Sequence, residues 1–106
     1  MLLDNAQDLV AKVIPKPTGT EREQAFLLGV GRELTLGWCE VQNAGSYADD
    51  IKIIRKCFDE GKVKLRFINA VFGPREDAQR FLREGPTINA CDHLFTQRTI
   101  KHIRTT

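Results

Sequence analysis

The side chains of this sequence that suit catalysis or metal binding are few, and their spacing is uninformative. His93 and His102 each lack a second ligand two or four residues away, the spacing that brings two side chains to one metal, so we expect isolated histidines. Asp49 and Asp50 precede an apolar-periodic segment and fit the first turn of a helix, where the helix dipole favours carboxylates. These residues predict no catalytic and no cofactor-binding group.

The cysteines also favour a structural role. Cys39, Cys57 and Cys91 are far apart, odd in number and form no CxxC pair, which predicts reduced thiols and a cytoplasmic protein. Cys39 is expected to pack within an apolar strand, because no histidine is placed beside it by the sequence.

Composition excludes some partners. Sixteen Lys and Arg against fourteen Asp and Glu leave a net charge of +2 in 106 residues, too balanced to indicate a nucleic-acid partner. The basic cluster Arg98, Lys101 and Arg104 has no interleaved aromatic residues and is expected to be a solvated strand end. No apolar run approaches the roughly 20 residues of a membrane span, and Met1-Leu2-Leu3-Asp4 does not resemble a signal peptide, so we expect no membrane partner.

The segment from Leu36 to Gly73 organises the chain. A helix is predicted over 47–60, because Ile51, Ile54 and Phe58 form one apolar stripe, with Ser46 as N-cap and Gly61 at the position after the helix. Strands are predicted on either side, over 36–45 and 62–72. Two strands joined by one helix usually lie parallel, so this is a βαβ unit.

The flanking segments extend the same alternation. Further helices are predicted over 2–14, ended by prolines, over 21–34, begun by a Thr20–Glu23 capping box, and over 75–84; a third strand is predicted over 96–103, after a segment without clear period. The prediction is an α/β fold of alternating helices and parallel strands, with about three strands in a single domain over 1–106. The sheet is expected to be covered on both faces or wrapped into a barrel.

The order of residues along the chain resembles amidohydrolase family 3. The resemblance spans Leu3 to Lys101 and is carried by Leu3-Asp4-Asn5-Ala6-x-Asp8-Leu9-Val10, Leu36-Gly37-Trp38-x-x-Val41-x-x-Ala44-Gly45, Ile53-x-Arg55-x-x-Phe58-x-Glu60-Gly61-Lys62-x-x-Leu65-Arg66 and Arg98-Thr99-Ile100-Lys101. It implies a partial (β/α)8 TIM-barrel segment of a metal-dependent hydrolase that cleaves non-peptide C–N bonds such as amides or N-formyl groups. A small-molecule amide would be the substrate, and a divalent metal, zinc above all, the cofactor of the full-length family.

The departures from the family pattern are as informative as the matches. The metal histidines would lie upstream of Met1 and beyond Thr106, so no metal is expected to bind this chain alone. Relatives often carry His-Asp where this chain has Gln42-Asn43. The sequence motif that follows the fourth-strand lysine in the family is also absent after Lys101. Lys101 is the one position that the resemblance marks for metal association, because a fourth-strand lysine can have this role.

Three hypotheses follow from the sequence. The first is an internal segment of a metal-dependent amidohydrolase, inactive alone, because three strands cannot close a barrel that needs about 250 residues. The second is a small non-catalytic α/β domain that associates with a partner or with itself through an exposed sheet edge. The third is a nucleic-acid accessory piece that uses the basic residues near the C-terminal end.

Overall fold

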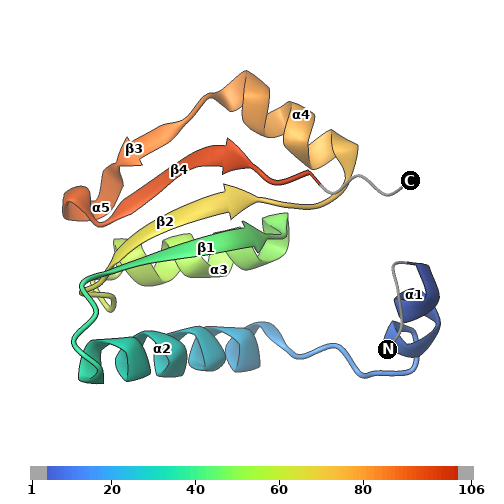
Figure 1. Ribbon diagram of the computed structural model, residues 1–106, viewed down its shortest axis with the longest axis horizontal. Coiled ribbons are helices and arrows are strands. Elements are labelled where there is room, and N and C mark those ends of the chain that lie inside the picture. Colours follow the sequence, from blue (N-terminus) through green and yellow to red (C-terminus); the bar gives the residue numbers. More distant parts are fainter. Residues whose placement is uncertain (1–4, 103–106) are drawn as a thin grey trace.

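The computed structural model describes residues 5–102, which form an α/β fold around a four-stranded, mostly parallel sheet (Figure 1). The elements in chain order are α1 (Asn5–Ala11), α2 (Gly19–Thr35), β1 (Glu40–Ser46), α3 (Ala48–Asp59), β2 (Arg66–Val71), α4 (Arg75–Glu84), β3 (Thr87–Asn89), α5 (Ala90–His93) and β4 (Phe95–Ile100). The strand order is β1-β2-β4-β3. The predicted α/β class is confirmed.

The sheet has three parallel strands and one antiparallel strand. β1 pairs with β2 and β2 pairs with β4 in parallel, as the βαβ interpretation predicted. The expectation of about three strands, all parallel, was wrong by one strand. β3 pairs antiparallel with β4 through the single register position Thr87↔Gln97, in the segment where no period was found.

Helix ends follow local capping chemistry, and two predicted caps were wrong. The hydroxyl of Thr18 accepts a hydrogen bond from the Glu21 amide at 3.1 Å, so α2 begins at Gly19 and no Thr20–Glu23 capping box forms. The N-cap of α3 is Tyr47, because Ser46 is the last residue of β1 and its hydroxyl bonds elsewhere. Gly61 follows α3 with φ +71° and closes it as predicted, while the Lys62 amide donates to the Cys57 carbonyl.

The remaining boundaries differ by a few residues. α4 covers the predicted range, whereas β2 is shorter than predicted, since Lys64 lies before it in irregular backbone. Cys39 lies just before β1 and is exposed, so its predicted packing inside a strand was wrong. Asp4 and Ile103, at the ends of two predicted elements, lie outside the described residues.

The hydrophobic core lies between one face of the sheet and the helices. Four phenylalanines from four elements meet there with ring centroids 5.2–6.4 Å apart: Phe26 of α2, Phe58 of α3, Phe67 of β2 and Phe95 of β4. Val30, Ile54, Cys57, Val63 and Leu65 complete the buried cluster. Each such aromatic pair stabilises the fold by about 0.5–1.5 kcal/mol beyond the contribution of the apolar area that it buries.

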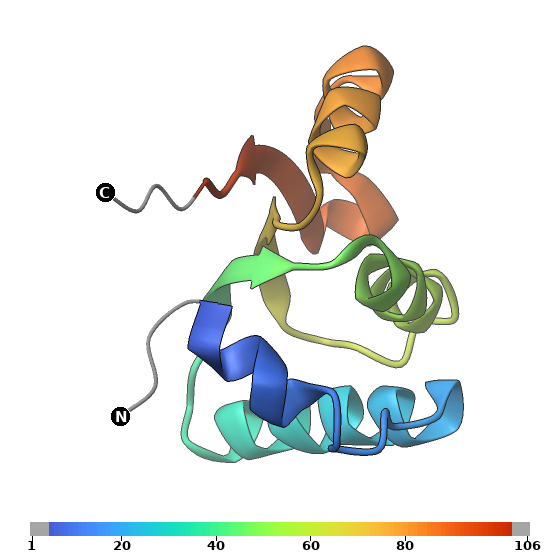
Figure 2. The same ribbon diagram turned by 90° about the vertical axis from the view of Figure 1, so that its right-hand side faces the viewer.

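The helices that connect the parallel strands lie on the same side of the sheet. Figure 2 shows α3 and α4 beside each other on one side of the strands, and no helix of residues 5–102 covers the opposite face. We call these the covered face and the open face. Gln42, Ala44 and Thr99 are exposed on the open face, so covering of both faces, one of the two predicted arrangements, is not what the described residues form.

Candidate functional site at the carboxyl ends of the strands

A network of hydrogen-bonded polar side chains runs across the three parallel strands, on the covered face of the sheet. Nδ2 of Asn43 donates to Oδ1 of Asn69 at 2.9 Å, and Nδ2 of Asn69 donates to Oε1 of Gln97 at 3.0 Å. The hydroxyl of Ser46 donates to the same Asn69 oxygen at 2.9 Å and accepts from Asn43. Asn69 is 1% exposed. We call these four residues the amide ladder.

Strand register places the ladder. Asn43 pairs with Asn69 and Asn69 with Gln97 in the parallel sheet, and each follows by two residues a hydrophobic side chain that faces the helices: Val41, Phe67 and Phe95. Because side chains two apart in a strand share a face, the polar residues must point the same way as the core. The sequence carried this signal, but the ladder was not predicted.

The ladder suits positioning rather than proton transfer. Its members are neutral amides and one hydroxyl, and no buried side-chain nitrogen or oxygen of the described residues lacks a partner. A satisfied buried network of this kind fixes which residues face each other across strands. It therefore holds the register of β1, β2 and β4 near the middle of these strands, and Ser46 extends it to the carboxyl end of β1. In folds of parallel strands, ligands bind at the carboxyl ends.

The open face carries a groove of about 460 Å³ near the carboxyl ends of the parallel strands. Its floor is apolar, formed by Ala44, Ile68 and Ala70. Polar side chains lie at its rim: Gln42 from β1, Thr99 from β4, and Lys101, which follows β4. This open-face groove brings Lys101 together with the polar side chains of Gln42 and Thr99.

Lys101 reaches across the ends of all three parallel strands. Its ammonium lies over the Phe72 ring, 5.6 Å from the centroid. A Cβ atom at Gly45 would lie 3.2 Å from Cδ of Lys101 and 2.8 Å from Cβ of Phe72. Glycine at the end of β1 is therefore what lets the β2 end and the lysine approach so closely.

The described residues do not form a metal site around Lys101. No group of three or more His, Cys, Asp or Glu side chains that could hold a metal ion occurs within residues 5–102. The groove is lined by one lysine, one threonine, one glutamine and the two asparagines of the amide ladder, whereas a catalytic zinc takes three protein ligands of His, Cys, Asp or Glu type. These groups therefore do not fit the metal that the family resemblance implies.

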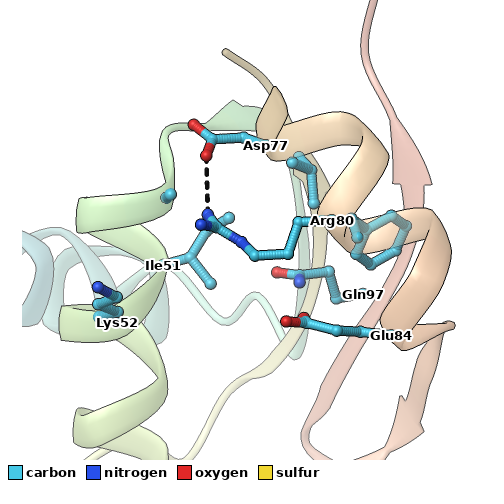
Figure 3. Close-up of a pocket in the computed structure, with 9 residues that line it drawn as sticks. Ile51, Lys52, Asp77, Arg80, Glu84 and Gln97 are labelled. Carbon is cyan, nitrogen blue, oxygen red and sulfur yellow. Dashed lines mark hydrogen bonds and ion pairs between the residues drawn. The ribbon is translucent and has the colours of Figure 1, made fainter. Parts of the chain in front are cut away.

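A second cavity, of about 320 Å³, lies between α3 and α4 (Figure 3). Lys52 of α3 and Arg80, Asp77 and Glu84 of α4 line it, above Gln97 of the amide ladder. Arg80 donates a hydrogen bond to Asp77 at 2.8 Å, so two of the four charged side chains that line the cavity pair with each other. The remaining charges are opposite in sign and belong to different helices, so the cavity carries no field of one sign.

The other residues considered from sequence are not brought together. His93 and His102 are both exposed, His93 on α5 and His102 after β4. Asp50 forms an ion pair with Arg22 of α2 at 3.4 Å, which links the first turn of α3 to α2. These positions give the structure no catalytic arrangement.

Two cysteines have thiols that are harder to ionise than usual. Burial raises the pKa of Cys57, which is fully enclosed in the core. Burial, and then a contact with Asp59, raises the pKa of Cys91, whose Sγ donates to the Asp59 carboxylate at 3.1 Å. The thiolate is the nucleophilic form, so both environments disfavour nucleophilic chemistry.

An ion-pair network links α2 to the turn that follows α3. Lys62 donates to Glu23 at 3.0 Å and pairs with Glu60 at 2.8 Å, while Lys56 lies 3.6 Å from Glu23. Hydrogen bonds from Lys62 lower the pKa of both carboxyls, and the same bonds raise the pKa of the lysine. The network stabilises the packing of α2 and lies away from the groove.

Comparison with known proteins returns no match. No protein-family model matches the chain, and neither a curated protein nor a solved structure matches it significantly. The fold shows a mostly parallel open α/β sheet, and the family resemblance stays a prediction. No helix of the described residues has the length and apolar character to cross a lipid bilayer.

Proposed function

We propose that this chain is a segment of the wall of a (β/α)8 barrel from a metal-dependent amidohydrolase, and that it is inactive alone. The observation that carries the proposal is the sheet with one bare face. The parallel strands β1, β2 and β4 follow one another in chain order across the sheet, and their connecting helices lie on one side (Figure 2). A doubly wound sheet reverses direction and places helices on both sides, whereas a barrel wall does not.

The outer edge of β1 supports the same proposal. An apolar groove of about 230 Å³ lies between α2 and β1, lined by Phe26, Gly29, Val30 and Val41 among others. A right-handed connection through α2 would place a preceding parallel strand beside β1, beneath this helix. The groove is where the helix-facing side chains of that strand would lie.

The far edge of β4 sets a requirement on the proposal. β3 pairs there at one register position, in the place of the next parallel strand of a barrel. The proposal requires β3 to leave this edge in the complete protein. The Ala90↔Phe95 bridge and a hydrogen bond from the Asn89 amide to the Thr96 hydroxyl add to this attachment. Together they are fewer than the five register positions that join β2 to β4.

The test is to purify the chain and to measure bound zinc and the hydrolysis of amide and N-formyl substrates. The proposal predicts no stoichiometric zinc and no turnover, because the groups that line the open-face groove do not fit a metal. It also predicts irregular self-association that grows with protein concentration, because both the bare face and the β1 edge are unpartnered in the described residues. Tight stoichiometric zinc with turnover would overturn it.

A second candidate function rests on the β1 edge. β1 is an edge strand that contains no lysine or proline, the residues that usually prevent edge pairing. In this alternative the chain is a non-catalytic domain that pairs through β1 with a partner or a second copy. A monodisperse species that melts cooperatively, and whose association is lost in a Gln42→Lys variant, would favour this alternative over the barrel segment.

A further inference from the structure

We propose that the open-face groove binds the carboxylate of a small aliphatic molecule, with Lys101 as its anchor. The biological role of this binding rests on the proposed function. In the complete barrel the groove would face the interior, and the bound carboxylate would be part of the enzyme's substrate. The binding itself is a property of the described residues and is tested on this chain.

The charge of Lys101 is available to a ligand. No carboxylate of residues 5–102 lies within ion-pair distance of its ammonium, whereas the strand residues Arg66 and Glu40 pair with each other at the other end of the sheet. The Phe72 ring attracts the ammonium but does not neutralise it, and it accepts no conventional hydrogen bond. The contact therefore holds the cation in place and leaves N–H donors for an anion.

The rest of the groove selects the shape of the ligand. The hydroxyl of Thr99, two residues before Lys101 along the chain, can donate to the second carboxylate oxygen. Gln42 lies on β1, across the β2 floor from Thr99, where its amide can donate to a polar substituent farther along the ligand. Ile68 and Ala70 form an apolar floor beside them, and Ala70 pairs in register with Thr99. A carboxylate with a short aliphatic chain satisfies both parts, whereas a polyanion such as a nucleotide would meet only one cation.

Gly45 acts as a positioning residue for this arrangement. It contributes no group to the ligand, but a methyl group there would collide with Phe72 and press on the Lys101 stem. The anchor depends on three strand ends being brought together. The carboxylate-binding groove therefore cannot be recognised from Lys101 alone.

The test is titration of the labelled chain with sodium butyrate, followed by amide resonances in ¹H–¹⁵N spectra. We expect saturable shifts at Gln42, Ala44, Ile68 and Thr99, and none with butyramide, which has the same shape without the charge. Lys101→Met should weaken butyrate binding at least tenfold. Lys101→Arg should keep it within a few-fold.

The matched control is Lys64→Met, which removes one positive charge at the opposite end of the strands, before β2. It should bind butyrate as the parent chain does. Equal shifts with butyramide, persistence of binding in Lys101→Met, or no saturable shift would each overturn the proposal. Butyrate binding without any hydrolase sequence around the gene would refute the barrel proposal and leave this one standing.

Discussion

Replacing Asn69 with alanine tests whether the amide ladder holds the strand register. Asn69 makes three side-chain hydrogen bonds at 2.9–3.0 Å and is 1% exposed. At about 1 kcal/mol for each bond, Asn69→Ala should weaken the ladder by about 3 kcal/mol. The loss falls on β2, because this strand lies between the other two parallel strands.

Amide hydrogen exchange measures this local effect directly. A loss of about 3 kcal/mol in the free energy of opening corresponds to exchange about 100-fold faster at the β2 amides over 68–71. The control is Gln42→Ala, an exposed side chain on the other face, for which a change within about 0.5 kcal/mol is expected. Acceleration below about five-fold in Asn69→Ala, or equal acceleration in both variants, would refute the role given to the ladder.

Three further outcomes are expected. Gly45→Ala should destabilise the chain by about 1–3 kcal/mol in denaturant unfolding, because its Cβ would lie 2.8 Å from Cβ of Phe72, which cannot rotate away; an unchanged midpoint would contradict the close approach. Glu23 has a pKa below its ordinary 4.5, so the stability it contributes is present above that pH and is lost as the pH falls further; Glu23→Gln should flatten this acid loss, and an unchanged acid profile would count against the network. A thiol reagent at neutral pH should modify exposed Cys39 well before Cys57, whose burial raises its pKa; equal rates would contradict the packing of the core.

Sequence patterns predicted the elements whose cues are local. α3 and α4 carry apolar stripes at helical spacing and glycines just beyond their ends, and both were located closely. The parallel βαβ pairing followed from the short connection between β1 and β2. Ser46 misled the cap prediction, because its hydroxyl bonds to Asn69 from a strand that is 23 residues away in sequence.

The segment before β4 could not be predicted from local cues. Asn89, Cys91, Asp92 and His93 all have positive φ, a conformation that non-glycine residues seldom adopt, although Asn, Asp and His tolerate it better than most. β3 and α5 are held by contacts with β4, through the Thr87↔Gln97 pair and the Asn89 amide, which donates to a β4 threonine. Long-range contacts overrode propensity here.

The candidate site was predicted only in part. The resemblance singled out Lys101, but the groove depends on which strands are neighbours and on the close approach at Gly45. The amide ladder depends on two strand registers at once, β1 with β2 and β2 with β4. Neither could be obtained from spacing along one chain, although the polar residue two positions after each core hydrophobe was visible in the sequence.

The most direct test of the barrel proposal is the nucleotide sequence on both sides of the reading frame. The proposal predicts codons, in frame or shifted, for a His-x-His strand upstream and for further metal histidines and an aspartate downstream. The flanking sequence should also encode enough further strands and helices to complete a closed barrel of roughly 250 residues. Flanking DNA that encodes no such residues in any frame would contradict it.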